Sequence, residues 1–295
     1  METIRTPEER FEDLPGFPYE GQYVEVDGTR LGYVEERGDG GETFLCLHGE
    51  PTWSYLYREM LPVLAERGRA IALDLPGLGR SDKWPAREDY TYDRLYDAVE
   101  GAVEALDLEG ITLVCQDWGG LLGLRVAAHN PGRFDRLVPA NTGLPTGEHG
   151  MPDVWHQFRE VVETAADLDV GRIVDGGTLA DLDEDVLDAY RAPFPDESYM
   201  AGVRAYPGLV PTEPDHPAAA PLRDARERLA DWEKPAFVLF GDADPITHRS
   251  RDDLRELLPT AGEQPDVWVE GASHFLQEDA GEQLAEEIVA FVDRT

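Results

Sequence analysis

Lysine is almost absent from this chain of 295 residues, which contains only Lys83 and Lys234. All 26 Lys and Arg stand against 61 Asp and Glu, so the net charge is −35. Such a surface repels nucleic acid phosphates and anionic lipids, so we expect neither nucleic acid nor membrane as a partner. Hydrophobic residues still make up 41% of the chain, which indicates a folded domain with an acidic surface rather than a disordered chain.

Long apolar runs and cysteines are also scarce. No run approaches the ~18 apolar residues that a membrane-spanning helix needs, and the acidic, proline-broken segment from Met1 to Glu20 has no signal-peptide core. We therefore expect an intracellular, cytoplasmic protein. The two cysteines, Cys46 and Cys115, lie on apolar strand-like runs, which favours buried reduced thiols.

Short apolar strands alternate with helices along most of the chain. Strands are predicted at 22–26, 31–34, 44–47, 70–73, 111–114, 136–141, 235–240 and 267–269. Helices are predicted at 53–67, 92–106, 118–130 and 281–293. This alternation predicts an α/β fold whose central sheet is mostly parallel and is flanked by helices on both faces.

The alternation breaks between residues 144 and 222, where no apolar strand occurs. Helix-like segments separated by prolines take its place, at 154–166, 183–190 and 197–206. We therefore predict a core domain formed by residues 1–143 and 223–295, with a helical cap inserted at residues 144–222.

Residues 115–120 read Cys-Gln-Asp-Trp-Gly-Gly, between an apolar strand and a helix. A strand that turns sharply into a helix exposes the side chain at the turn, as in the nucleophile elbow G-x-S-x-G. Here that residue is Asp117, whose carboxylate is already an anion at pH 7. A carboxylate nucleophile suits attack on an electrophilic sp³ carbon, with an ester of the protein as the intermediate. The alternative is an ordinary turn in which Asp117 caps the helix.

Two further polar residues follow later strands. Asp244 lies in Gly-Asp-Ala-Asp-Pro after the strand at 235–240, and His274 lies in Gly-Ala-Ser-His-Phe after the last strand. Loops at the carboxyl ends of parallel strands meet at one edge of a sheet. Asp117, Asp244 and His274 therefore have the chain order nucleophile, acid, histidine of a catalytic triad, with Asp242 as an alternative acid.

On these residues the chain resembles the haloalkane dehalogenases of the α/β-hydrolase superfamily, over nearly its whole length. The most specific similarities are His-Gly-Glu-Pro-Thr-Trp-Ser-Tyr-Leu-Tyr-Arg at 48–58 and Gln-Asp-Trp-Gly-Gly at 116–120, with others at 170–174, 192–196 and 271–278. The resemblance implies an α/β-hydrolase fold and hydrolysis of a haloalkane to an alcohol and halide. The expected partners are a small halogenated hydrocarbon, water and halide, without cofactor, and the chain is expected to be a monomer or weak homo-oligomer.

The resemblance also implies roles for the triad. Asp117 displaces the halide and carries the alkyl ester. His274 then removes a proton from water, which hydrolyses the ester. The resemblance favours Asp244 over Asp242 as the acid that orients His274. The remaining histidines show no metal-ligand spacing.

Donors for the developing charges are expected from backbone and indole N–H groups. The backbone N–H groups of Glu50 and Trp118 are expected to form the oxyanion hole. A halide in an apolar pocket needs donors, and the Trp118 indole supplies one. Because an ionised Glu50 cannot donate, Trp155 in the cap is expected to supply the second, with Trp232 as its competitor. The expected apolar pocket walls are Phe158, Phe194, Leu209, Val210 and Phe275.

Three other functions share this fold. An epoxide hydrolase combines the Asp nucleophile with cap tyrosines that donate protons to the epoxide, and Tyr190, Tyr199 and Tyr206 keep this alternative open. A fluoroacetate-type dehalogenase needs cations that bind the substrate carboxylate, and Arg159 and Arg172 could be mistaken for such cations. A catalytically idle receptor would bind a ligand without turnover.

The acid-rich, lysine-poor composition resembles that of proteins from halophiles that accumulate salt. Between about 0.1 M and about 1 M salt, the Debye length falls from about 10 Å to about 3 Å, so repulsion among surface carboxylates is screened. We predict that the midpoint of thermal unfolding, measured by circular dichroism, rises by more than about 5 °C across this range of KCl. Sorbitol at equal osmolality screens no charge and is the control. A midpoint that KCl leaves unchanged would contradict a halophilic protein.

Overall fold

A six-stranded sheet forms the centre of the computed structural model, which describes residues 2–295. Its strands, in the spatial order β1-β2-β4-β3-β5-β6, are β1 (Gln22–Val26), β2 (Thr29–Arg37), β4 (Gly68–Leu73), β3 (Glu42–Leu47), β5 (Ile111–Gln116) and β6 (Phe134–Ala140). β2 pairs antiparallel with β1 and β4, and the other pairs are parallel. All six residues of β5 are buried, as expected for a central strand covered on both faces.

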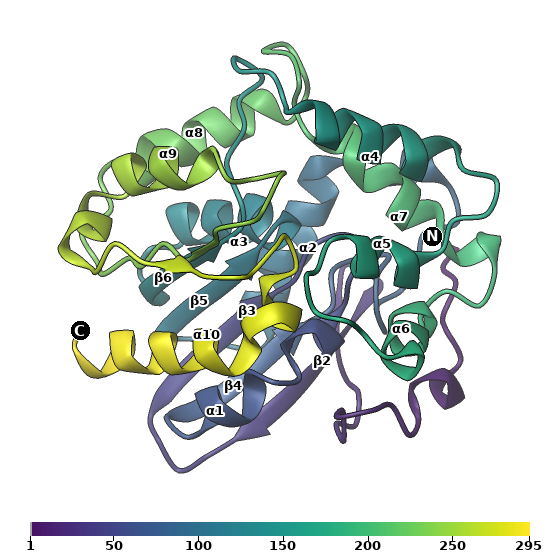
Figure 1. Cartoon of the computed structure of the whole chain (residues 1–295), viewed down its shortest axis with the longest axis horizontal. Coiled ribbons are helices and arrows are strands. Elements are labelled where there is room, and N and C mark those ends of the chain that lie inside the picture. The colour runs from purple at the N-terminus through teal and green to yellow at the C-terminus, as the bar shows by residue number, and fades with distance from the viewer. Residues whose placement is uncertain (1) are drawn as a thin grey trace.

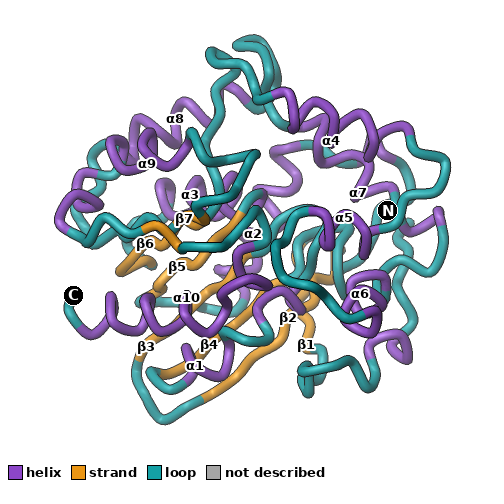
Figure 2. Tube along the Cα trace, viewed as in Figure 1, coloured by secondary structure: helices purple, strands orange, loops and turns teal. Residues whose placement is uncertain are grey.

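Helices cover both faces of this sheet (Figure 1). In that view α1 (Leu61–Ala65) and α10 (Leu276–Asp293) lie in front of the strands, and α2 (Tyr92–Ala105) and α3 (Trp118–His129) lie behind them. Figure 2 shows the strands as a layer between these helices. Two further helices, α8 (Ala219–Leu229) and α9 (Ser250–Leu257), lie at the side of β6. The predicted α/β-hydrolase architecture, a mostly parallel sheet between helices, is therefore confirmed.

Four of the helices between β6 and β7 (Phe240–Gly241) lie beyond the sheet, to the right in Figure 1, whereas α8 lies on the opposite side of that view. They are α4 (Asp153–Thr164), α5 (Val170–Gly176), α6 (Glu184–Arg191) and α7 (Ala201–Ala205). The boundary predicted between residues 222 and 223 falls within α8, which packs against α3. Short 3-10 helices complete the structure at Glu8–Phe11, Ser54–Tyr57, Arg87–Asp89, Glu197–Tyr199, Tyr206–Leu209 and Pro259–Glu263.

Two segments that were predicted as continuous helices are each divided into shorter helices in the structure. The segment 53–67 divides into the 3-10 helix Ser54–Tyr57 and α1. Pro62 lies in the first turn of α1, where its missing N–H is tolerated, whereas a helix running through it from residue 53 would lose a hydrogen bond. The segment 197–206 likewise divides into a 3-10 helix and α7, followed by a second 3-10 helix.

The predicted strand at 235–240 is regular only at its end. Phe240 and Gly241 pair in parallel with β8 (Trp268–Val269). Earlier in the run, isolated bridges join Ala236 and Leu239 to β6. Pro139 of β6 has no N–H to donate, so the ladder lacks a hydrogen bond at this point. The run still lies parallel to β6 and extends the sheet.

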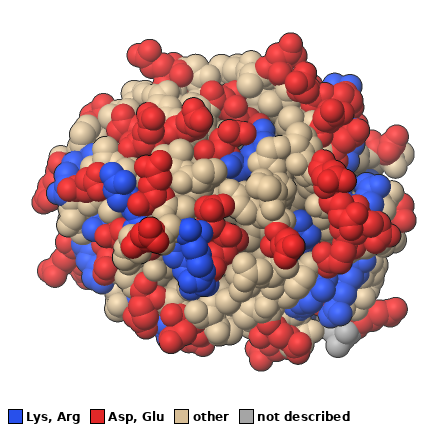
Figure 3. Space-filling model, turned by 90° about the horizontal axis from the view of Figure 1, so that it is seen from below, with Lys and Arg blue, Asp and Glu red and all other residues tan. Residues whose placement is uncertain are grey.

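Most charged side chains lie on the surface and the two cysteines lie in the core, as the composition predicts. Figure 3 shows one face of the molecule, on which Asp and Glu spread around the whole outline with Lys and Arg in smaller groups beside them. Cys46 and Cys115 are buried and unpaired, and burial raises the pKa of both thiols. Among residues 2–295, no helix combines the length and apolar character needed to cross a membrane.

A buried ion pair ties α10 to the 3-10 helix after β3. Both guanidinium Nη atoms of Arg58 donate to Glu278, with a distance of 2.6 Å from Nη2 to Oε2. The hydroxyl of Tyr190, on α6, donates to the same carboxylate. The Arg58 and Glu278 side chains are only 8% and 1% exposed. Glu278 therefore joins α6 to two elements of the core.

Removing the charge of Glu278 should destabilise the fold. In Glu278→Gln, the one carboxylate left in an ion pair with Arg58, among residues 2–295, is the exposed one of Glu59, at 3.6 Å. We predict that the free energy of unfolding in urea falls by about 3 kcal/mol, because a buried cation loses its partner. Asp293→Asn, which breaks the exposed pair with Arg67, is the matched control and should change the midpoint little. Equal destabilisation by the two variants would contradict this account.

Candidate active site

Asp117 stands at the turn between β5 and α3, with φ 48° and ψ −122°. Few residues with a side chain adopt such angles, and those that do are concentrated at functional sites. The backbone packs tightly around the turn. A Cβ on Gly49 would lie 2.2 Å from Oδ1 of Asp117, and one on Gly119 would lie 2.0 Å from the carbonyl oxygen of Leu47. Glycine at both positions therefore permits the sharp elbow that the sequence predicts.

Backbone N–H groups hold the Asp117 carboxylate from one side. Oδ1 accepts a hydrogen bond from the N–H of Glu50 at 3.0 Å, and the N–H of Trp118 also donates to the carboxylate. On the other side, Oδ2 lies 3.7 Å from Nε2 of His274. Burial raises the pKa of Asp117, while His274 and the two N–H groups oppose the rise. The structure thus brings both predicted oxyanion-hole residues to Asp117.

His274 lies between the two aspartates. Its Nδ1 is 3.2 Å from Oδ1 of Asp244. Asp244 also accepts the backbone N–H groups of Ile246 and Thr247, at 2.9 and 3.1 Å, and the Thr247 hydroxyl. With Nδ1–H donating to Asp244, Nε2 is left as an acceptor facing Asp117. Burial lowers the pKa of His274, but attraction by the two carboxylates outweighs burial and raises it overall.

The alternative acid, Asp242, lies elsewhere. It is exposed, and its Oδ1 accepts the backbone N–H of Gly271 at 2.8 Å. Asp244 is buried, and burial alone would raise its pKa, but His274, Thr247 and Ile246 outweigh burial and lower it. The structure therefore places an ionised Asp244, and not Asp242, against the imidazole.

Two buried amides that sequence reasoning did not select hold the turn that carries His274. Gln116 Nε2 lies 3.3 Å from Nε2 of His274 and donates to its backbone oxygen at 3.2 Å. Asn141 donates to the backbone oxygens of Ser273 and His274, at 2.7 and 3.1 Å, and accepts the N–H of Gly241 at 2.9 Å. An amide at the end of an apolar strand was the available signal for both residues.

Asp279, near the start of α10, holds the same turn from another direction. Its Oδ2 accepts the backbone N–H of Ser273 at 2.7 Å. Its Oδ1 accepts those of Leu179 and Ala180, each at 2.7 Å. The segment that follows α5 is therefore fixed to the residue before His274.

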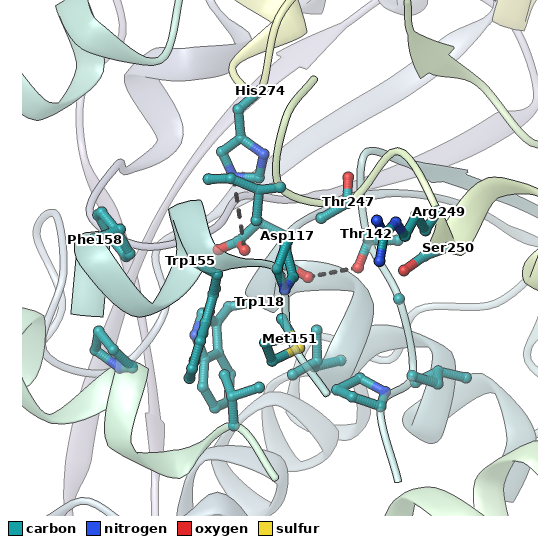
Figure 4. Close-up of a pocket in the computed structure, with 18 of the residues that line it drawn as sticks. Asp117, Trp118, Thr142, Met151, Trp155, Phe158, Thr247, Arg249, Ser250 and His274 are labelled. Carbon is teal, nitrogen blue, oxygen red and sulfur yellow. Dashed lines mark hydrogen bonds and ion pairs between the residues drawn. The ribbon is translucent and has the colours of Figure 1, made fainter. Parts of the chain in front are cut away.

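A cavity of about 930 Å³ lies over Asp117 and His274 (Figure 4). Its inner wall is largely apolar and includes Leu121, Phe158, Ile173, Val210 and Phe275. Three of the five expected wall residues are among these, whereas Phe194 and Leu209 do not line the cavity. Phe194 lies instead near the ammonium group of Lys83, 5.6 Å from its ring centroid.

Trp118 and Trp155 both line this cavity beside Asp117 (Figure 4). Neither indole N–H has a hydrogen-bond partner within residues 2–295. By contrast, the indole of Trp53 donates to the backbone oxygen of Ala189 at 3.1 Å. Trp232 is buried and does not line the cavity. The two indoles predicted for halide binding are thus the two that face the same space as the nucleophile.

Glu50 is buried, and its Oε1 has no hydrogen-bond partner in the described chain. Burial, together with the nearby charge of Asp117, raises the pKa of Glu50 well above its usual range. Both effects favour the protonated acid over the carboxylate. The sequence argument took Glu50 as a carboxylate that cannot donate, whereas a protonated carboxyl group has one O–H donor.

The cap tyrosines point to other partners. None of Tyr190, Tyr199 and Tyr206 lines the cavity. The hydroxyl of Tyr190 donates to Glu278, and that of Tyr206 donates to the backbone oxygen of Pro76 at 2.9 Å. The proton donors that an epoxide hydrolase requires are therefore missing from the cavity wall that the structure describes.

The two arginines considered for binding a substrate carboxylate, Arg159 and Arg172, are both paired with carboxylates of the protein. Arg159 does not line the cavity and pairs with Glu163 at 2.7 Å. Arg172 lines it but pairs with Asp175 and Glu184. Between residues 2 and 295, no group of three or more His, Cys, Asp or Glu is arranged to hold a metal ion.

Residues 42–280 match the family model for the alpha/beta hydrolase fold. The haloalkane dehalogenase of Psychrobacter cryohalolentis is 43% identical, with 99% of this chain and 98% of that protein covered. That of Mycobacterium marinum is 45% identical, with 99% and 100% covered. Among solved structures, the tetrameric haloalkane dehalogenase DpaA from Paraglaciecola agarilytica NO2 has a TM-score of 0.90 at 37% identity, over 97% of each chain.

The charge of Asp244 should control the titration of His274. We predict that Asp244→Asn lowers the pKa of His274, measured by NMR of the imidazole, because the cationic form loses its nearest carboxylate while burial remains. In the unmodified protein this pKa should lie above the ordinary 6.5. Asp242→Asn is the control, since Asp242 does not contact His274, and it should leave the titration unchanged. A shift in both variants, or in neither, would contradict the assignment.

Proposed function

The chain belongs to the haloalkane dehalogenases, which hydrolyse a carbon–halogen bond to an alcohol and halide, and we propose that Asp117, His274 and Asp244 carry out this reaction. One observation supports the proposal above all. A single cavity contains a carboxylate held by two backbone N–H groups, a histidine facing it, and two indole N–H groups without partners. These are the groups that displacement of a halide and hydrolysis of an ester require.

In the first step, Asp117 attacks the carbon that bears the halogen. Oδ1 is engaged by the N–H of Glu50, which leaves Oδ2 as the attacking atom. The new Oδ2–carbon bond forms as the carbon–halogen bond breaks, and the halogen leaves with the bonding electron pair as halide. The product is an alkyl ester on Asp117.

In the second step, His274 takes a proton from water through Nε2, and the hydroxide adds to Cγ of Asp117. The negative charge develops on Oδ1, where the N–H groups of Glu50 and Trp118 stabilise it. As the Cγ–Oδ2 bond breaks, the leaving oxygen takes the proton from His274 and departs as the alcohol. Asp117, which now has one oxygen from water, loses the proton of the added hydroxyl to solvent and is again a carboxylate. Asp244 holds the imidazole in the tautomer that can accept the proton and stabilises its charged form.

The halide produced in the first step is held by Trp118 and Trp155. Trp155 lies near the start of α4, so the second donor comes from outside the core. An anion in an apolar cavity needs such donors, because its desolvation is otherwise uncompensated.

We propose that residues 144–222 act as the cap and that residues 1–143 and 223–295 form the core. On this division the cap supplies Trp155 and Phe158, and the core supplies the triad. The composition supports a salt-rich cytoplasm as the location and a monomer or weak homo-oligomer as the working state. Because the relative DpaA is tetrameric, the oligomeric state of this protein should be measured by sedimentation.

The proposal is tested by bromide release from 1-bromobutane in molar salt. We predict steady turnover by the unmodified protein and loss of at least about 10⁴-fold in Asp117→Ala, which lacks the nucleophile. His274→Gln should release one bromide per protein molecule and then stop, because the ester forms but water is not activated. Mass spectrometry should then find a butyl group on the peptide that contains Asp117.

The corresponding epoxide, 1,2-epoxybutane, is the control substrate. Diol formation without bromide release would contradict the proposal and assign the protein to epoxide hydrolysis. A butyl group on any residue other than Asp117 would overturn the choice of nucleophile.

A further inference from the structure

The two ends of the active-site cavity differ in chemistry. The inner end is apolar apart from the reacting groups, as described above. The outer end, where the lining side chains are exposed or partly exposed, has charged groups, namely Arg172, Arg223, Arg226, Arg249, Glu148, Glu227 and Asp253. A volume of about 930 Å³ is in the range of pockets that take ligands far larger than a short haloalkane. The cavity therefore fits a substrate with an apolar halogenated end and a polar end.

Arg249 differs from every other cation of the chain. Of the 26 Lys and Arg, it alone forms no hydrogen bond or ion pair with any residue between 2 and 295. This occurs in a chain with 61 Asp and Glu, where partners are abundant. Arg249 is exposed at the cavity mouth, and Figure 4 shows its guanidinium on the side of Thr142 and Ser250. An unpaired guanidinium at the mouth is available to a ligand.

A continuous wall joins this guanidinium to the nucleophile. The hydroxyl of Thr142 donates to the backbone oxygen of Asp117 at 2.7 Å (Figure 4). The next residue, Gly143, lies against Ser250, since a Cβ on it would be 2.8 Å from Oγ of Ser250. Ser250 directly follows Arg249, and all of these residues line the cavity. A chain extending from Asp117 along this wall reaches Arg249.

The other charges at the outer end leave Arg249 open. Arg226 is paired with Asp253, at 2.6 and 2.7 Å. Arg223 donates only to the backbone oxygens of Thr146 and Pro214. With Arg172, which pairs with Asp175 and Glu184, and with Glu148 and Glu227, the outer end has four cations and three carboxylates in its wall. The wall therefore has no excess of carboxylates although the whole chain carries −35, so an anion is not repelled there as it is by the remaining surface.

We propose that Arg249 binds the carboxylate of an ω-haloalkanoate whose halogenated end reaches Asp117. The planar guanidinium can donate two parallel N–H bonds to the two oxygens of a carboxylate. This inference rests on the proposed function. The carbon–halogen bond is replaced by the bond to Asp117 and then hydrolysed, so water and the ω-haloalkanoate give an ω-hydroxyalkanoate, halide and a proton. The carboxylate at the far end is unchanged.

The test compares kcat/KM for 6-bromohexanoate, its uncharged amide and 1-bromohexane, by bromide release. The unmodified protein should prefer the carboxylate to the amide. Arg249→Gln should reduce that preference about three- to tenfold, mainly through KM, as expected for a partly exposed ion pair. The rate with 1-bromohexane should not change. With the longer 8-bromooctanoate and its amide, the preference of the unmodified protein for the carboxylate should differ from that measured with the six-carbon pair. The preference of Arg249→Gln should be the same for both chain lengths.

Arg172→Gln is the matched control, because Arg172 lines the same cavity but already pairs with Asp175 and Glu184. It should keep the preference for the carboxylate. An unchanged preference in Arg249→Gln, an equal loss in Arg172→Gln, or an equal loss with 1-bromohexane would overturn the subsite. If 1-bromohexane yields no bromide from the unmodified protein, the proposed function itself fails, and the subsite fails with it.

Discussion

An ionised carboxylate must be kept inside a cavity whose walls are mostly apolar, and the structure around Asp117 meets that requirement. Burial disfavours the charge, as the raised pKa of Asp117 shows. Two backbone N–H groups offset part of this effect, but they reach the carboxylate only because the elbow adopts a strained backbone and Gly49 leaves room for it. The same donors lie where negative charge returns to Oδ1 during ester hydrolysis. The groups that hold the resting nucleophile are therefore already in place for the later intermediate, and little reorganisation is needed between the two.

The position of His274 depends on a turn that is held by hydrogen bonds from several other elements. His274 is held by amides from the ends of β5 and β6, by Asp244 after β7, and by the carboxylate of Asp279 through the neighbouring Ser273. Asp279 also binds the segment after α5, and the adjacent Glu278 binds α6 through a tyrosine hydroxyl. The position of the imidazole and that of the helices beyond the sheet are thus coupled through two consecutive carboxylates. A displacement of these helices would reach the proposed base, His274, as well as the proposed halide donor on α4, Trp155.

Much of this site could be predicted because its reacting groups each follow an apolar strand. Asp117, Asp244 and His274 are placed by chain order and by the parallel sheet, both of which are visible in the sequence. The contacts of Gln116 could not be predicted, since they depend on which side chains meet across different strands. The prediction of one continuous helix across Pro62 was wrong, because the spacing of apolar residues carries no information about a missing backbone N–H. The raised pKa of Glu50 could not be predicted for a related reason, since burial is a property of the fold and not of the residue.

Surface charge and site chemistry operate over different distances in this molecule. The repulsion among surface carboxylates acts across solvent, and molar salt reduces its range to about 3 Å. The hydrogen bonds that hold Asp117, and the indole N–H groups that face the cavity, act at contact and away from solvent, where salt screens little. Salt can therefore stabilise the fold without weakening the groups that hold the nucleophile. Both kinds of interaction occur at the cavity mouth, because its arginines are in contact with solvent and also within reach of a bound molecule. Of the charged groups around the cavity, these are the ones through which salt concentration can alter which substrates bind.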